Sequence, residues 1–215
     1  MRPRLLALLL LIALPAFAAG KLETTGEFPD SSAPAALRAA LESRGYRVIG
    51  SDGSVLCEIW LRRAVPARPR AEAEGIFYSE LAPSALVGVI SYPKGGHDFR
   101  GQTIQPGAYT LRYELLPNDG NHLGVAPNRD FLLLVPIAVD PGPDAAIPYD
   151  RLVKLSAQAA GANHPAPLSL TLLPAGNLPQ VFQTGNSYEA FAATLATQSG
   201  GKLPFALIVK GEAQQ

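Results

Sequence analysis

Between Pro106 and Leu116 the chain alternates strictly between apolar and polar side chains, and this pattern constrains the fold more than any other feature. The apolar set is Tyr109, Leu111, Tyr113 and Leu115, and the polar set is Thr110, Arg112 and Glu114. Successive side chains of a β-strand point to opposite faces, so a period of two predicts a strand with one buried and one solvated face. Strands of this kind belong to antiparallel sheets that cover a core on one side.

Other short segments are also expected to form strands, because turn residues separate them. These segments are 46–49, 54–62, 76–81, 85–92, 131–139, 168–172 and 203–210. Apolar residues at helical spacing predict helices at 34–44, 148–160 and 187–197. Because strands and helices do not alternate regularly, we expect a mainly β protein, an antiparallel β-sandwich with about three decorating α-helices.

The N-terminus has the three parts of a secretory signal peptide. Arg2 and Arg4 form a basic start, and the residues from Leu5 to Leu14 form an unbroken apolar run. Ala16-Phe17-Ala18 then offers small residues for cleavage. The apolar run is ten residues long, whereas a helix needs about 20 apolar residues to cross a membrane. The pattern therefore predicts a cleaved signal peptide and an exported protein, either periplasmic or extracellular.

Export divides the chain into a signal peptide at 1–18, a leading segment with a short helix at 19–45, and a β-sandwich domain at 46–215. Lys21 to Ser31 has little periodicity, so we expect it to be loose. After cleavage 16 basic and 18 acidic residues remain, a net charge of −2. This balance does not suit nucleic acid as a partner. No later apolar stretch is long enough for a membrane span, so none is expected in the mature chain.

Cys57 is the only cysteine, so no disulfide can form within the chain. It alternates with Val55, Ile59 and Leu61. We therefore expect Cys57 to be a small buried apolar side chain within a strand. The exported domain must then be held together by the packing of its core.

Each of the three histidines falls in a predicted loop next to an acid or an amide. These pairs are His97 with Asp98, His122 with Asn121, and His164 with Asn163. The sequence contains no Gly-x-Ser-x-Gly elbow, no His-Glu-x-x-His, no phosphate loop and no paired-cysteine zinc site. The histidine pairs are therefore the candidate ligand-binding residues.

Three interpretations of these loops stay open. In the first, the Asn, Asp and Gly residues form turns and the histidines are solvated. In the second, the loops bind a glycan or another component of the cell envelope through hydrogen bonds to hydroxyl groups. An aromatic surface for a sugar would then come from Trp60, Tyr92 or Tyr109.

The third interpretation is a zinc or hydrolytic site formed by His122, His164 and a carboxylate such as that of Asp119 or Asp130. These residue types suit zinc, which is the one cofactor that the sequence suggests. His97 is left out of this site, because it lies at the opposite end of the 106–116 strand from His122. The ends of such a strand are about 30 Å apart.

The strand start Pro106-Gly107-Ala108-Tyr109-Thr110-Leu111 resembles that of secreted bacterial β-sandwich families, including carboxypeptidase-regulatory-like modules. In such sandwiches the proline and glycine form the turn and the tyrosine enters the core. The longer stretch from Asp98 to Leu132, together with Asn163-His164-Pro165, resembles signal-peptide-bearing bacterial proteins. The resemblance implies a sandwich and transfers no functional residue.

The sequence therefore favours an exported protein with a non-catalytic binding or envelope-associated role, and it does not indicate the ligand. One alternative is a metal-dependent hydrolase that uses His122 and His164. A second alternative is a structural module that contacts another protein through the polar face of Thr110, Arg112 and Glu114.

Overall fold

The computed structural model describes residues 20–98, 101–116, 128–185 and 188–211. The described chain is mainly β and all of its strand ladders are antiparallel. The strands are β1 (Lys21–Thr25), β2 (Gly45–Ile49), β3 (Val55–Leu61), β4 (Leu86–Tyr92), β5 (Gly96–His97), β6 (Thr103–Ile104), β7 (Gly107–Leu115), β8 (Asp130–Pro136), β9 (Pro167–Ser169), β10 (Gln180–Thr184), β11 (Tyr188–Ala196) and β12 (Lys202–Lys210). The helices are α1 (Ala35–Ala40) and α2 (Tyr149–Ala160). Neither of these two helices has the length and apolar character needed to cross a membrane.

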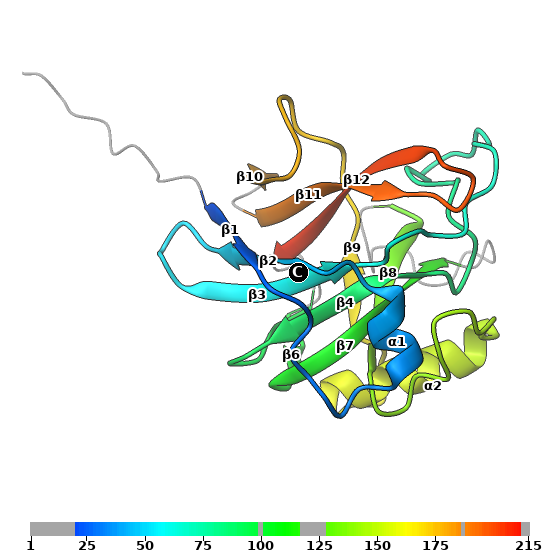
Figure 1. The fold of residues 1–215 in the computed structure, drawn as a ribbon, viewed down its shortest axis with the longest axis horizontal. Coiled ribbons are helices and arrows are strands. Elements are labelled where there is room, and N and C mark those ends of the chain that lie inside the picture. The colour runs from blue at the N-terminus through cyan, green and yellow to red at the C-terminus, as the bar shows by residue number, and fades with distance from the viewer. Residues whose placement is uncertain (1–19, 99–100, 117–127, 186–187, 212–215) are drawn as a thin grey trace, which may run out of the picture.

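Two sheets contain most of the strands (Figure 1). The larger sheet has seven strands in the order β1-β2-β3-β4-β7-β8-β9, and the smaller sheet has the order β10-β11-β12. An isolated bridge between Leu170 and Leu207 joins the two sheets beyond the end of β9. There the Thr171 N–H donates to the Ala206 carbonyl at 3.0 Å. The short strands β5 and β6 form a separate two-stranded ladder.

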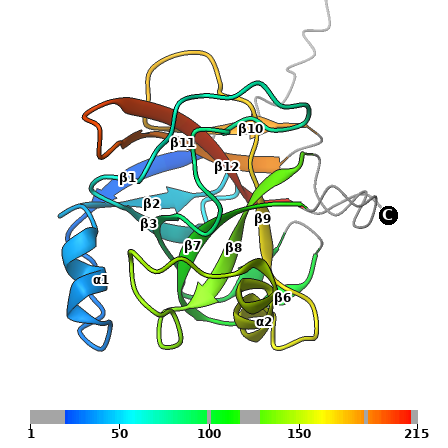
Figure 2. The same cartoon turned by 90° about the vertical axis from the view of Figure 1, so that its right-hand side faces the viewer.

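The main core lies between these two sheets, which face one another in Figure 2. From the larger sheet it receives Cys57, Ile59 and Tyr113, and from the smaller sheet Phe191 and Phe205. All of these side chains are buried. The burial of Cys57 and Ile59 confirms that residues 55–61 present one apolar face to the core.

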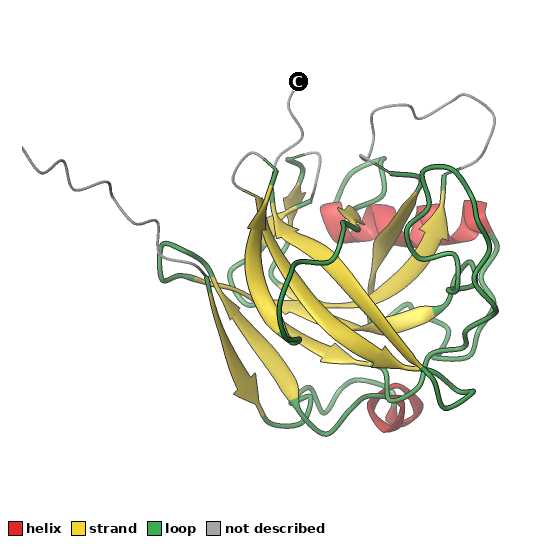
Figure 3. Cartoon of the chain, turned by 90° about the horizontal axis from the view of Figure 1, so that it is seen from above, coloured by secondary structure: helices red, strands yellow, loops and turns green. Residues whose placement is uncertain are grey.

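The opposite face of the larger sheet is also covered, because both helices lie on the side away from the smaller sheet (Figures 1 and 3). Leu37 of α1 packs against Trp60 and Leu86. Leu152 of α2 packs against Phe131 and Leu133 of β8. The larger sheet is therefore the middle of three layers, which explains why its strands are apolar on both faces.

The two helices that form differ in how well the sequence predicted them. The helix expected at 148–160 is confirmed as α2, and Gly161 ends it in the left-handed region with φ 60°. The helix expected at 34–44 is shorter, because α1 ends at Ala40. Gly45 begins β2 instead of ending a helix. A Cβ at Gly45 would lie 2.5 Å from Trp60 Nε1, so only glycine fits there.

The helix expected at 187–197 is wrong, because Tyr188–Ala196 forms β11 and pairs with both β10 and β12. The expected count of about three helices therefore becomes two among the described residues. The expectation of a loose leading segment is also wrong for Lys21–Thr25, which pairs with β2 as β1. The strand expected at 76–81 is a series of turns with a single bridge at Leu81.

The strand predicted from the apolar–polar alternation of residues 106–116 is confirmed as β7. Its polar face, however, is not solvated. Thr110 and Arg112 have no exposed surface, and Glu114 is 5% exposed. The covering layer is the outer loop, defined as residues 137–148 between β8 and α2, together with the helices. The polar face of β7 is therefore not available as a surface that contacts another protein. A structural module that contacts a partner through another surface stays a prediction.

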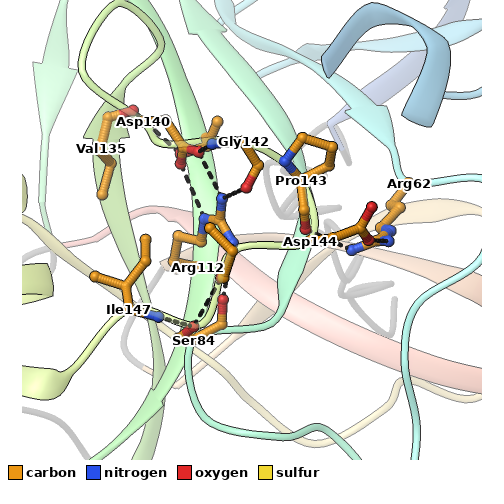
Figure 4. A network of polar contacts seen from close by, with 11 residues as sticks. Arg62, Ser84, Arg112, Val135, Asp140, Gly142, Pro143, Asp144 and Ile147 are labelled. Atoms are coloured by element: carbon orange, nitrogen blue, oxygen red, sulfur yellow. Dashed lines mark hydrogen bonds and ion pairs between the residues drawn. The ribbon is translucent and has the colours of Figure 1, made fainter. Parts of the chain in front are cut away.

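Arg112 is buried with every N–H of its guanidinium group hydrogen-bonded (Figure 4). Nε and Nη2 donate to the two carboxylate oxygens of Asp140 at 2.9 and 2.5 Å. Nη2 also donates to the Gly142 carbonyl at 2.5 Å. Nη1 donates to the carbonyls of Ser84 and Ala145 at 3.0 and 3.4 Å. A charge removed from water is tolerated only when it is paired and its donors are used, and Arg112 meets both conditions.

A second arginine fastens the same outer loop. Arg62, which directly follows β3, is 6% exposed and donates to the Pro143 carbonyl at 2.8 Å. It also forms an ion pair with Asp144 (Figure 4). The Thr110 hydroxyl also donates a hydrogen bond to Asp140 Oδ2 at 2.6 Å. The outer loop is therefore fixed to the larger sheet by hydrogen bonds at several points.

We predict that Arg112→Ala lowers the free energy of unfolding by about 3–5 kcal/mol, because it leaves the Asp140 carboxylate buried without its partner. Urea unfolding followed by tryptophan fluorescence measures this loss. Arg47→Ala is the matched control, since Arg47 pairs with Glu58 while its own side chain is 43% exposed. The control should lose at most about 1 kcal/mol. Equal losses in the two variants would contradict the role assigned to Arg112.

Candidate functional site

A cavity of about 490 Å³ lies at one end of the two sheets, and we call it the end cavity. Four strand ends of the two main sheets meet there: the start of β3, the end of β4, the start of β11 and the end of β12. The antiparallel register explains this meeting, because Glu58 near the start of β3 pairs with Ser91 near the end of β4. In the same way, Glu189 of β11 pairs with Lys210 of β12. The turn between β2 and β3 marks this end of the molecule in Figure 1.

The wall of the end cavity is largely apolar. Its apolar residues are Val55, Leu56, Tyr92, Tyr188 and Val209. Tyr92 and Val209 are buried members of the main core, and Leu56 packs against that core. Val55 is 37% exposed, which is unusual for a valine at the start of a strand that otherwise faces inward. The cavity is therefore an extension of the main core that stays open to solvent.

The rim of the end cavity is cationic. Lys94, His97 and Lys210 line it, and all three are exposed. Asp52 in the β2–β3 turn accepts a hydrogen bond from Lys210 Nζ at 3.3 Å. Hydrogen bonds from the Ser54 hydroxyl and N–H, with a smaller contribution from Lys210, lower the pKa of Asp52 to about 2. Asp52 is thus ionised at neutral pH, and the lysines and Asp52 together leave an excess of positive charge.

Tyr92 brings a polar atom into this largely apolar region. Its side chain is 1% exposed, and its hydroxyl has no hydrogen-bond partner among the described residues. Burial, with smaller effects from Cys57 and Asp98, raises the pKa of Tyr92 well above its usual value. The hydroxyl therefore stays protonated. A buried hydroxyl without a hydrogen-bond partner lowers the stability of the folded protein.

The first histidine pair is divided between the cavity and the protein interior. His97 ends β5 and contributes to the cavity rim, as a ligand-binding role requires. Asp98 is fully buried and holds its own loop, since its carboxylate accepts from the backbone N–H of Gln102 at 2.9 Å and from Gln102 Nε2 at 2.8 Å. We therefore assign Asp98 to loop structure.

The other histidine pairs do not join the end cavity. Asn163 and His164 follow α2 and are exposed, and neither lines the cavity. Asn121 and His122 lie outside the described residues. Their predicted roles in ligand binding stay predictions.

Asp130 is not arranged as a free metal ligand. It is fully buried at the start of β8. Its Oδ2 accepts the backbone N–H groups of Phe77 and Tyr78 at 2.9 and 2.7 Å, and Asn128 Nδ2 donates to Oδ1 at 3.4 Å. The described residues contain no group of three His, Cys, Asp or Glu side chains that could bind a metal. The zinc site with His122 and His164 stays a prediction, because His122 is outside the described part of the chain.

The aromatic residues suggested for a sugar surface are buried. Trp60 is 1% exposed and its Nε1 donates to the Gly26 carbonyl at 2.9 Å. Tyr109 is 4% exposed and its hydroxyl donates to the Gln105 carbonyl at 2.7 Å. Together with the buried Tyr92, these side chains do not present a flat face on which a sugar ring could stack.

The sequence pointed to His97 as a ligand-binding residue and to Tyr92 as an aromatic for a sugar surface, but it gave no sign of the other residues that line the cavity. Val55, Lys94, Tyr188 and Lys210 lie far apart in the chain, and none belongs to a motif. The one feature that these residues share is their position, because each of them lies at or next to the end of a strand. Pairing of those strand ends brings them together, and the order of the strands was not readable from the sequence.

We predict that Tyr92→Phe raises the free energy of unfolding of the ligand-free protein by about 1 kcal/mol, because it removes a buried hydroxyl without a partner. Tyr78→Phe is the matched control. The Tyr78 hydroxyl donates to the Thr171 carbonyl at 2.6 Å and accepts the Ala206 N–H at 2.9 Å. That control should lose about 1–3 kcal/mol. Loss of stability in both variants would show that the Tyr92 hydroxyl has a partner.

A second prediction concerns pH. Burial raises the pKa of Asp130, although the N–H groups of Tyr78 and Phe77 oppose this. A raised pKa in the folded state means that folding favours the protonated carboxyl, so this contribution is lost as the pH rises. Wild type should therefore lose stability relative to Asp130→Asn between about pH 4 and neutral pH in urea unfolding.

Asp52→Asn provides the control of opposite sign, because the pKa of Asp52 is lowered to about 2. Here the contribution is present above the usual aspartate pKa and is lost as the pH falls toward 2. Wild type should therefore gain stability relative to Asp52→Asn as the pH rises through this range. The same pH trend in both comparisons would contradict the assignment for Asp130.

No family model, curated protein or solved structure matches this chain. The resemblance of the strand start at Pro106 to secreted β-sandwich modules stays an interpretation of the sequence. We therefore infer the function from the geometry of the end cavity and from the chemistry of the residues that line it.

Proposed function

We propose that this chain is an exported β-sandwich protein with a non-catalytic role, and that it binds a small ligand with an apolar body in the end cavity. The observation that carries this proposal is the open apolar cavity of about 490 Å³ at the end of the main core. Small-molecule sites are typically concave and mostly apolar, with volumes of about 300–1,000 Å³ and a few polar groups. The end cavity has all of these properties.

The chemistry of the lining supports binding rather than hydrolysis. Ser54 is the only Ser, Thr or Cys in the lining, which consists of described residues. Its hydroxyl donates to Asp52 Oδ1 at 2.6 Å. A general base works best with a pKa near the working pH. Because the pKa of Asp52 is about 2, this carboxylate is too weak a base to activate Ser54 at neutral pH.

The predicted export signal agrees with a ligand from the cell envelope. A protein in the periplasm or outside the cell would meet apolar molecules released from membranes, and the end cavity suits such molecules better than it suits a sugar. A sugar ring would stack on an exposed aromatic face, whereas the three aromatic residues suggested for that role, Trp60, Tyr92 and Tyr109, are buried. An envelope component with an apolar body is therefore the form of partner that we propose.

We predict that the protein binds the neutral fluorescent probe N-phenyl-1-naphthylamine and that Val55→Asp weakens this binding by more than about tenfold. Placing a carboxylate in the apolar wall forces the probe to desolvate a charge. The measurement is a fluorescence titration of the folded protein. Because Val55 is already 37% exposed, the substitution should leave the unfolding temperature nearly unchanged.

Val139→Asp is the matched control for this test. Val139 is 38% exposed, almost the same as Val55, but it lies in the outer loop and does not line the end cavity. This variant should bind the probe as wild type does. Absence of probe binding to wild type, or equal weakening by the two substitutions, would overturn the proposed function.

A further inference from the structure

We propose that the ligand is a single-chain amphipathic anion, with its alkyl chain in the end cavity and its anionic group bound at the rim by Lys94 and Lys210. This inference rests on the proposed function and adds the chemical class of the ligand. It predicts the orientation of the ligand as well, because the charge must stay at the rim while the chain points toward the main core.

Lys94 and Lys210 are both exposed at the rim of the end cavity. Lys94 follows β4 and has no ion-pair partner among the described residues, although it lines the cavity. Lys210 pairs with Asp52, but the two side chains are 49% and 55% exposed. Exposed ion pairs of this kind contribute little and exchange readily. Both ammonium groups are therefore available to an anion at the rim.

The acids near the rim do not offset the charge of both lysines. Asp52 offsets one of the two lysines. Glu189 is the other nearby acid, and its Oε1 accepts from the N–H and hydroxyl of Ser51 at 3.0 and 2.6 Å. A Cβ on Gly50 would lie 2.8 Å from Glu189 Oε2, so this carboxylate faces the β2–β3 turn. Glu189 does not line the end cavity, and the excess charge presented to a ligand is positive.

Behind the rim, the wall of the end cavity is apolar. Tyr92 and Val209 belong to the main core, and Leu56 packs against it. A chain that enters past the lysines therefore meets progressively buried apolar side chains. Each methylene that leaves water should strengthen binding by about fourfold, so affinity should rise with chain length until the cavity is filled.

The decisive experiment compares decanoate with 1-decanol, which share one alkyl chain and differ in charge. Each ligand displaces N-phenyl-1-naphthylamine from the full protein at low ionic strength. Decanoate should bind at least about fivefold more tightly than decanol, and this preference should shrink at high salt because the rim charges are exposed. Hexanoate and octanoate should bind progressively more weakly than decanoate.

The variants Lys94→Met and Lys210→Met test whether the preference for decanoate over decanol arises at the rim. Each should reduce the ratio of decanoate to decanol affinity, and the double variant should bring it close to one. Decanol binding should stay unchanged, because the apolar wall is intact. Lys202→Met is the matched control: Lys202 begins the same strand that Lys210 ends, it is exposed, and it does not line the end cavity.

The outcomes separate this inference from the proposed function. If the neutral probe binds but decanoate and decanol bind equally, the anionic class is wrong and the binding function stands. If Lys202→Met reduces the ratio as much as the rim variants, the location is wrong. If the probe, decanol and decanoate all fail to bind, the proposed function itself is overturned. Sedimentation with phosphatidylglycerol vesicles but no decanoate binding would assign the rim to a bilayer surface instead and overturn the inference.

Discussion

The fold depends on one fully satisfied buried charge, the guanidinium group of Arg112. Its five N–H groups bind the Asp140 carboxylate and the carbonyls of Gly142, Ser84 and Ala145. Three separate parts of the chain meet at this side chain: β7, the turn before β4, and the outer loop (Figure 4). An apolar side chain at the same position could fill the space but could not fix the direction of the loop. The hydrogen bonds of Arg112 to Asp140, Gly142 and Ala145 thus hold the outer loop against the larger sheet.

The same interaction explains where the sequence was informative and where it misled. Period two in residues 107–115 predicted a strand correctly, because alternation reflects the geometry of the backbone. It also predicted a wet face, and this was wrong. A row of polar side chains shows that one face of a strand needs hydrogen-bond partners. It does not show whether those partners are water molecules or other groups of the protein. Arg112 and Thr110 are satisfied by Asp140, which is 28 and 30 residues away in the chain.

The strand β11 shows a different limit. Tyr188, Phe191 and Leu195 fall at helical spacing, and the alanines between them favour a helix. In the structure both faces of this strand are buried between neighbours, so no alternation marks it, and pairing with β10 and β12 outweighs local propensity. The end cavity was unpredictable for a related reason, since it exists only once the packing of the two sheets brings together strand ends that are far apart in the sequence, such as those of β4 and β12. Of the residues in the histidine pairs, His97 is the one that the described structure places on its rim.

The bridge between Leu170 and Leu207 has a consequence for association between copies of the protein. The unpaired backbone groups of an edge strand are a template for pairing with another chain, and they promote aggregation. This bridge joins the β9 edge of the larger sheet to the β12 edge of the smaller one. The other edge strands of the two sheets, β1 and β10, also contact each other. Each edge of the two main sheets therefore lies against an edge of the other, which leaves an incoming strand little room to dock.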